Sequence, residues 1–245
     1  MLVFLQIPRS TLGAYRAFRQ ALGEEAVGWV GRNLKESDLA DPQLHTRFKV
    51  VGGPFTLADV DHLPVVTSYA AVVAHPVART MGQFTEAIGD VDHPFHAAPH
   101  TFMLREIFEE KHPFAEAMSN VATRHLMETA DAPASVDAAV AAIEARRFIV
   151  GDGGNVKPFI TMLARVLDVK PEALDEAAFS PPGAPPAKGE LLRLIREANT
   201  EDIALFKHLK AQEGHRRMAL RTKGERIVRR RKDGRKSRPK AADPA

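Results

Sequence analysis

The first 22 residues place the strongest constraint on the fold. Residues 2–7 are nearly all apolar and do not alternate with polar ones, which is typical of a strand covered on both faces. A short loop at Pro8–Thr11 follows. Residues 12–22 then carry apolar side chains at helical spacing, among them Tyr15 and Phe18. A buried strand, a loop and a helix in this order predict an α/β fold with a mainly parallel sheet.

The rest of the chain shows further segments of both kinds. Patterning predicts strands at 65–73, 100–105 and 148–150, and helices at 106–127 (broken near Pro113), 134–145, 157–167 and 191–210. Residues 56–59 are expected to begin a short helix capped by Thr56. Residues 89–99 are expected to form a loop, and the proline-rich residues 180–186 a stiff surface connection.

Composition excludes several classes of protein. The 245 residues are 44% hydrophobic, which is enough to bury a core, and they include no cysteine. Disulfides, iron–sulfur clusters, thiolate zinc sites and cysteine nucleophiles are therefore excluded. No apolar run approaches the roughly 18 residues of a membrane-spanning helix. The apolar start is too short for a signal peptide and lacks a basic beginning, so we expect a cytoplasmic protein without a transmembrane segment.

The net charge of +3 conceals an uneven distribution. Residues 214–245 hold 13 of the 34 basic residues and 3 of the 31 acidic ones, so an acidic body carries a basic tail. The tail contains no aromatic residue that could stack on bases or insert into lipid. We expect it to be a disordered extension or an unspecific electrostatic contact for an anionic partner, with nucleic acid and membrane as alternatives.

The loop between the first strand and helix is a candidate anion site. Such a loop offers free backbone amides and the positive end of the helix dipole. Arg9 adds a cation, and Ser10 and Thr11 add hydroxyl groups. The Walker A spacing is absent. From these residues alone, an ordinary surface turn remains an equal alternative.

Five segments in order resemble carbohydrate-type sulfotransferases that use 3′-phosphoadenylyl sulfate. They are Phe4–Ser10 (similar to F-L-H-I-P-K-T), Val73–His75 (similar to a segment ending in Gly-His), Thr101–Glu106 (T-x-L-R-D-P), Asn120–Arg124 (N-x-x-T-R) and Arg147–Gly151 with the helix after it. Order and spacing agree over residues 2–210. The resemblance implies a P-loop-like three-layer sandwich at residues 1–213. From the charge distribution we expect a basic C-terminal helix and disordered tail at 214–245 to follow it.

The resemblance also implies a reaction. A sulfuryl group would pass from 3′-phosphoadenylyl sulfate to a hydroxyl acceptor, expected to be a saccharide or small metabolite, without a metal. The implied site consists of Arg9, Ser10, Thr11 and Gly13 at the 5′-phosphosulfate, Arg105 at the 3′-phosphate, and His75 as general base. A guanidinium suits bidentate contact with phosphate, and an imidazole with an ordinary pKa near 6.5 suits proton transfer near pH 7.

Departures from the family pattern favour a second hypothesis. Ala14 and Tyr15 stand where the family has Thr-Ser, and Ile107 replaces the proline of T-x-L-R-D-P. Pro113 occupies the position of a serine that contacts the 3′-phosphate, and proline has no donor to offer. The chain could therefore be a degenerate member that binds or scaffolds without catalysis. A third hypothesis is an anionic-surface or nucleic-acid binder that works through the tail.

Each candidate residue also has a plainer interpretation. Arg9 could be a solvated surface residue, and His75 an inert histidine at a strand end. Arg105 could lie at a strand end and pair with Glu106 or Glu109. Arg124 could form a structural ion pair. The histidines and aspartates of residues 90–100 could assemble a metal site, but two prolines and the absence of helical spacing favour a solvated loop.

Overall fold

Within the described part of the chain, five parallel strands form a single sheet in the computed structural model. The strands are β1 (Leu2–Gln6), β2 (Val27–Trp29), β3 (Val50–Gly53), β4 (Thr67–Val73) and β5 (Ile149–Asp152), in the spatial order β2-β3-β1-β4-β5. The structure describes residues 2–6, 12–53, 55–60, 67–127, 132–179 and 186–212. Residues up to Phe206 form one unit, to which the following account refers. The prediction of an α/β protein with a mainly parallel sheet is confirmed.

The connections around β1 create a switch point in the sheet. Gln6 pairs with Gly53 of β3 on one side and with Ala71 of β4 on the other. The chain leaves β1 toward β2 and leaves β4 toward β5, and these strands lie at opposite edges of the sheet. Open α/β sheets bind ligands outside the carboxyl ends of strands where connections diverge in this way. That place lies beyond Gln6 and Val73.

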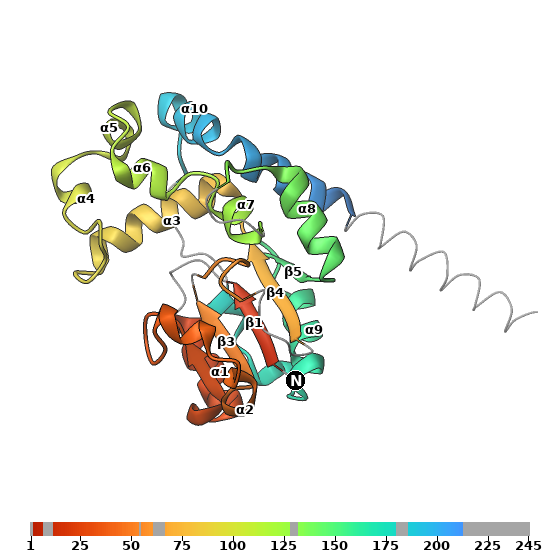
Figure 1. Ribbon diagram of the computed structural model, residues 1–245. Helices are drawn as coiled ribbons and strands as arrows, with labels where there is room; N and C mark the ends of the chain where they lie inside the picture. Colours follow the sequence, from red (N-terminus) through yellow and green to blue (C-terminus); the bar gives the residue numbers. More distant parts are fainter. Residues whose placement is uncertain are drawn as a thin grey trace, which may run out of the picture. The chain divides into compact units, whose positions relative to one another are not determined.

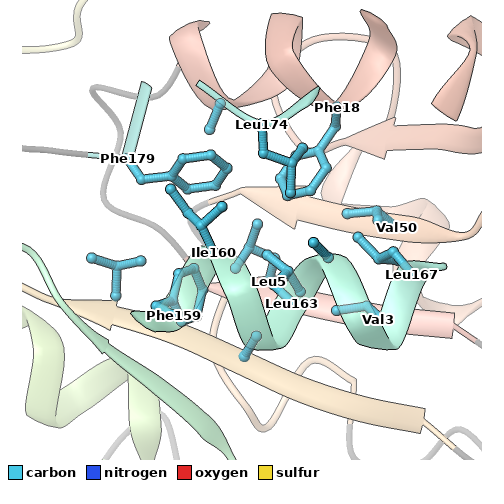
Figure 2. Packing of buried hydrophobic residues seen from close by; sticks show 14 of the residues in the cluster. Val3, Leu5, Phe18, Val50, Phe159, Ile160, Leu163, Leu167, Leu174 and Phe179 are labelled. Carbon is cyan, nitrogen blue, oxygen red and sulfur yellow. The ribbon is translucent and has the colours of Figure 1, made fainter. Parts of the chain in front are cut away.

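Two helices cover one face of the sheet. They are α1 (Leu12–Leu22) and α9 (Lys157–Leu167), which begin and end where the sequence predicts them. Phe18 of α1 and Leu163 of α9 are fully buried in one cluster with Val3 and Leu5 of β1 (Figure 2). Alternate residues of β1 therefore point to these helices, as the period-two geometry of a strand requires.

Glycines allow aromatic side chains to lie flat against this sheet. A Cβ atom on Gly52 would lie 2.3 Å from the ring of Trp29, and one on Gly151 would lie 2.6 Å from the ring of Phe159. These separations are far below van der Waals contact, so neither position accommodates a side chain without movement of the ring.

Aromatic rings pack on the opposite face. Phe4 of β1 contacts Tyr69 of β4 with centroids 6.0 Å apart, and Phe55 edge-on at 5.8 Å. Tyr69 in turn stacks on Phe148 at 5.2 Å. Both faces of β1 are therefore buried, in agreement with its continuous apolar sequence.

The remaining helices gather mainly beyond the carboxyl ends of the strands (Figure 1). They are α3 (Pro76–Gly89), α4 (Ala98–Thr101), α5 (Leu104–Glu109), α6 (Pro113–Ala117), α7 (Val121–Leu126), α8 (Val136–Ala145), α10 (Gly189–Ala198) and helical residues 200–206. The helices α3, α4, α5, α6 and α10 share a second apolar core, in which Ile107, Phe114 and Ile195 are buried. Short elements elsewhere are α2 (Leu44–Arg47), η1 (Glu24–Ala26), η2 (Glu36–Ala40), η3 (Pro171–Ala173) and η4 (Glu176–Phe179).

Two predictions of local structure are wrong, and two strands were not predicted. Residues 100–105 are not a strand but run from the end of α4 through the linking residues 102–103 into the start of α5. The reason is that the Glu106 carboxylate accepts the Met103 N–H at 2.7 Å and caps α5, while Leu104 enters the second core. Residues 56–59 form a turn in which Asp59 accepts from Thr56, and the described residues up to Val60 continue as turn and not as helix. Strands β2 and β3 went unpredicted.

Across the part of the chain that the structure describes, no helix combines the length and the apolar character that crossing a membrane requires.

Candidate functional site

His75 lies at the switch-point edge of the sheet. It follows β4 by two residues and is the N-cap residue of α3, which begins at Pro76. Strand β4 continues two residues beyond Ala71, the partner of Gln6, so His75 is on the carboxyl side of both central strands. The predicted position of this histidine at a strand end is confirmed.

The surroundings of His75 favour its neutral form. Its ring meets the ring of Phe206 edge-on, with centroids 5.3 Å apart. Partial burial lowers the pKa of His75 below its ordinary value of 6.5, and the positive charge of Arg196 lowers it further. At pH 7 the imidazole is therefore uncharged and can accept a proton.

A buried arginine lies one helical turn beyond His75. The side chain of Arg79 is 3% exposed. Its Nη2 donates to Asp202 Oδ2 at 3.1 Å, Asn199 Oδ1 at 2.7 Å and the Met118 carbonyl at 2.9 Å. Its Nη1 donates to Gln83 Oε1 at 2.6 Å. A buried charge needs partners of this kind, because desolvation otherwise costs several kcal/mol.

Asp202 extends the network to the start of α7. Its Oδ1 accepts from the backbone and hydroxyl of Thr123 at 2.8 and 2.7 Å, and its Oδ2 accepts from the Ala122 N–H at 3.1 Å. Asn120 adopts a left-handed conformation and accepts from the N–H groups of Glu201 and Asp202. The segment that resembles N-x-x-T-R therefore forms part of a buried polar junction.

A cavity of about 750 Å³ opens beside this junction. Residues 30–36, which directly follow β2, form one wall together with Asp38. Gln83 of α3, residues 93–95, and α6 and α7 form the others. The stacked rings of Phe95 and Phe114, 4.9 Å apart, provide an apolar surface. The volume lies within the range usual for small-molecule sites, roughly 300–1,000 Å³.

The polar groups of the cavity have balanced charge. Arg32 and Lys35 contribute two cations, and Glu36 and Asp38 two carboxylates. His125 is neutral, because burial and the charges of Arg124 and Arg79 lower its pKa to about 4. A polar organic molecule without a large net charge suits this lining.

The implied phosphosulfate residues are only partly described. Arg9, Ser10 and Thr11 lie outside the described residues. Gly13 lies in the first turn of α1, where a Cβ atom would be 3.2 Å from Ala178 Cα. Close packing of α1 against η4 is therefore sufficient to explain this glycine.

Arg105 is engaged by its own helix. It lies on α5 with its side chain 57% exposed, and its Nη2 is 2.7 Å from Glu109 Oε1. The alternative that Arg105 pairs with Glu109 is confirmed, on a helix where a strand end was expected. Arg124 donates to the Glu116 carbonyl at 3.0 Å.

The 90–100 segment holds its histidines in separate roles. His93 Nδ1 accepts the Phe95 N–H at 3.1 Å, and His96 Nδ1 lies 2.9 Å from the Ala87 carbonyl. Among the described residues, no three histidine or carboxylate side chains gather closely enough to hold a metal ion.

Comparison with known proteins gives no relative. No family model, no curated protein and no solved structure matches the chain. The case for function therefore rests on the residues and their geometry.

Sequence reasoning missed Arg79, Asp202 and the cavity residues that follow β2. One signal was present: Asn199 and Asp202 share the helical spacing of the buried Ile195 and Leu205. Polar residues in an apolar stripe indicate a buried network.

Proposed function

We propose that the chain is a degenerate, sulfotransferase-like protein that binds a small organic molecule, such as a saccharide, without transferring a sulfuryl group to it. The cavity at the carboxyl side of the sheet is the observation that carries this proposal. It is large enough for such a molecule, and it combines stacked aromatic rings with polar groups of balanced charge.

The residues for the nucleotide fit poorly at its 3′-phosphate end. Arg105 is already paired with Glu109, and Pro113 begins α6 without a side-chain donor. An arginine that must leave a carboxylate to reach a phosphate gains less from the exchange than an unpaired one. This arrangement supports binding over catalysis.

Sulfuryl transfer is the second candidate, and His75 favours it. A neutral imidazole at the carboxyl end of β4 is suited to take the proton of an acceptor hydroxyl. In that case Arg9, Ser10, Thr11 and Gly13 would hold the phosphosulfate of 3′-phosphoadenylyl sulfate, as the resemblance implies. The strand arrangement around β1 also supports a P-loop-like fold, which both candidates share.

Calorimetry with 3′-phosphoadenosine 5′-phosphate separates the two candidates. The degenerate protein should give no heat at millimolar nucleotide. Tight binding, together with sulfate transfer that is abolished in His75→Ala and Arg9→Ala, would establish the enzyme and overturn our proposal.

A cavity-filling variant tests the binding site itself. Ala117→Phe adds a ring to the cavity wall, and Ala141→Phe makes the same change on an exposed position of α8. In a thermal-shift screen of monosaccharides and small aromatic alcohols, molecules that stabilise the native chain should lose their effect only in Ala117→Phe. An unchanged response in Ala117→Phe, or no response of the native chain, would refute the cavity as the site.

A further inference from the structure

Three regularly spaced residues, of which His75 is the first, lead from the carboxyl edge of the sheet to the cavity. His75, Arg79 and Gln83 lie at intervals of four along α3 and its N-cap, so they follow one face of the helix. His75 is at the edge of the sheet, Arg79 is buried, and Gln83 lines the cavity. Arg79 can only donate hydrogen bonds, so it binds the carbonyl oxygen of Gln83 and leaves the amide N–H groups for the cavity.

The facing helical segment carries matching residues. Asp202 and Phe206 are also four residues apart. Asp202 pairs with Arg79 at 3.1 Å, and Phe206 contacts His75 at a centroid distance of 5.3 Å. Two contacts, one helical turn apart, therefore fix the relative position of α3 and residues 200–206.

We propose that Arg79 and Asp202 are positioning residues, whose buried ion pair holds Phe206 against His75 and orients Gln83 in the cavity wall. The inference rests on the proposed function in treating His75 and the cavity as the working site. Its test requires neither a ligand nor an activity.

The network has the properties that such a role requires. Asn199 joins the same guanidinium and also accepts the Asn120 N–H, while Asp202 caps the first turn of α7. These bonds are buried or partly buried, and they join three separate segments of the chain. A packed junction with several buried hydrogen bonds can hold side chains in one geometry more firmly than exposed pairs can.

The titration of His75 reports the position of Phe206. Burial is the main cause of the lowered pKa of His75, and Arg196 of α10 is the charged group that contributes to it. If Phe206 moves away, the ring becomes hydrated and its pKa rises toward 6.5. Removing the negative charge of Asp202 would by itself lower a nearby pKa, so a rise in Asp202→Asn cannot be an effect of charge.

The experiment is an NMR titration of the His75 imidazole in the full chain, with the resonance assigned through His75→Gln. We expect an upward shift of the His75 pKa in Asp202→Asn, and loss of the ring-current shift from Phe206. Phe206→Leu should give the same rise. Glu201→Gln is the matched control, since this neighbouring acid bonds the Val136 N–H of α8, and it should leave the His75 pKa unchanged.

A folded Asp202→Asn with an unchanged His75 pKa and ring-current shift, beside a raised pKa in Phe206→Leu, would overturn the inference. If the single variant does not fold, Arg79→Met combined with Asp202→Asn removes both buried charges and serves the same test. If His75 responds as expected while no molecule of the screen binds, the proposed function fails and the positioning role stands.

Discussion

Arg79 and Asp202 form a buried ion pair across 123 residues of sequence, with Nη2 and Oδ2 3.1 Å apart. Exposure is 3% for the arginine side chain and 1% for the aspartate. Burial lowers the pKa of Arg79, and the Asp202 carboxylate offsets part of this effect. The pair is the centre of the polar junction between α3, α7 and residues 199–206.

Loss of either partner should strongly destabilise the fold. We expect Asp202→Asn and Arg79→Met each to lower the free energy of unfolding by about 3–5 kcal/mol, because each leaves one buried charge uncompensated. The double variant should lose less than the two single losses together. Urea denaturation of the four proteins measures this coupling. Glu201→Gln should cost about 1 kcal/mol, and additive single losses would contradict the prediction.

Gly52 should not tolerate even a methyl group. Gly52→Ala places a carbon 2.3 Å from the Trp29 ring and should cost about 1–3 kcal/mol through movement of that ring. Gly89→Ala is the matched control, because it lies at the end of α3 with no atom within 4 Å of the added carbon. Thermal unfolding with Trp29 fluorescence should show a lower midpoint for Gly52→Ala only.

His125 should make the fold sensitive to mild acid. Its pKa of about 4 in the folded chain is below the ordinary 6.5, so the unfolded chain takes up the proton first. The contribution of His125 to the stability of the fold is therefore fully present above pH 6.5. It is lost as the pH decreases toward 4, by up to about 3 kcal/mol. His125→Gln should reduce this slope between pH 6.5 and 4. The exposed His45→Gln should keep it, and equal slopes in the two variants would contradict the assignment.

The structure of the body should not depend on the basic tail. We expect a chain that ends at residue 213 to keep the unfolding midpoint of the full chain, because the cores described lie within residues 2–206. The same truncation should remove binding to a heparin column at low salt, since it deletes 13 basic residues. Retention of the truncated body on the column would place the anion-binding surface elsewhere.

The sequence was sufficient for elements with strong periodicity. Both α1 and α9 were predicted at their observed bounds, because their apolar stripes face one core. Strands β2 and β3 have only three and four residues, and glycine fills half of β3, so they carry little pattern. Residues 100–105 resembled a strand in composition, but the Glu106 cap and the second core determine a helix.

The candidate site was predictable only where local sequence defines it. His75 follows a strongly apolar strand, and its position could be deduced from that strand alone. Arg105 was placed on a strand, although Glu109 was one of its two expected partners; the pairing is between residues four apart on a helix, which a strand would not bring together. The pair of Arg79 and Asp202 depends on two helices meeting across 123 residues, which no local pattern specifies.

The central position of β1 has a consequence for how the chain is made. This strand is synthesised before its partners, which are residues 50–53 and 67–71. At about 5–20 residues per second, a ribosome needs several seconds to add the residues that complete its pairing. During that interval β1, whose residues Leu2 to Leu5 are buried in the finished fold, lacks one or both of its partner strands. Nascent chains that stall before residue 71 should therefore be the species that chaperones retain.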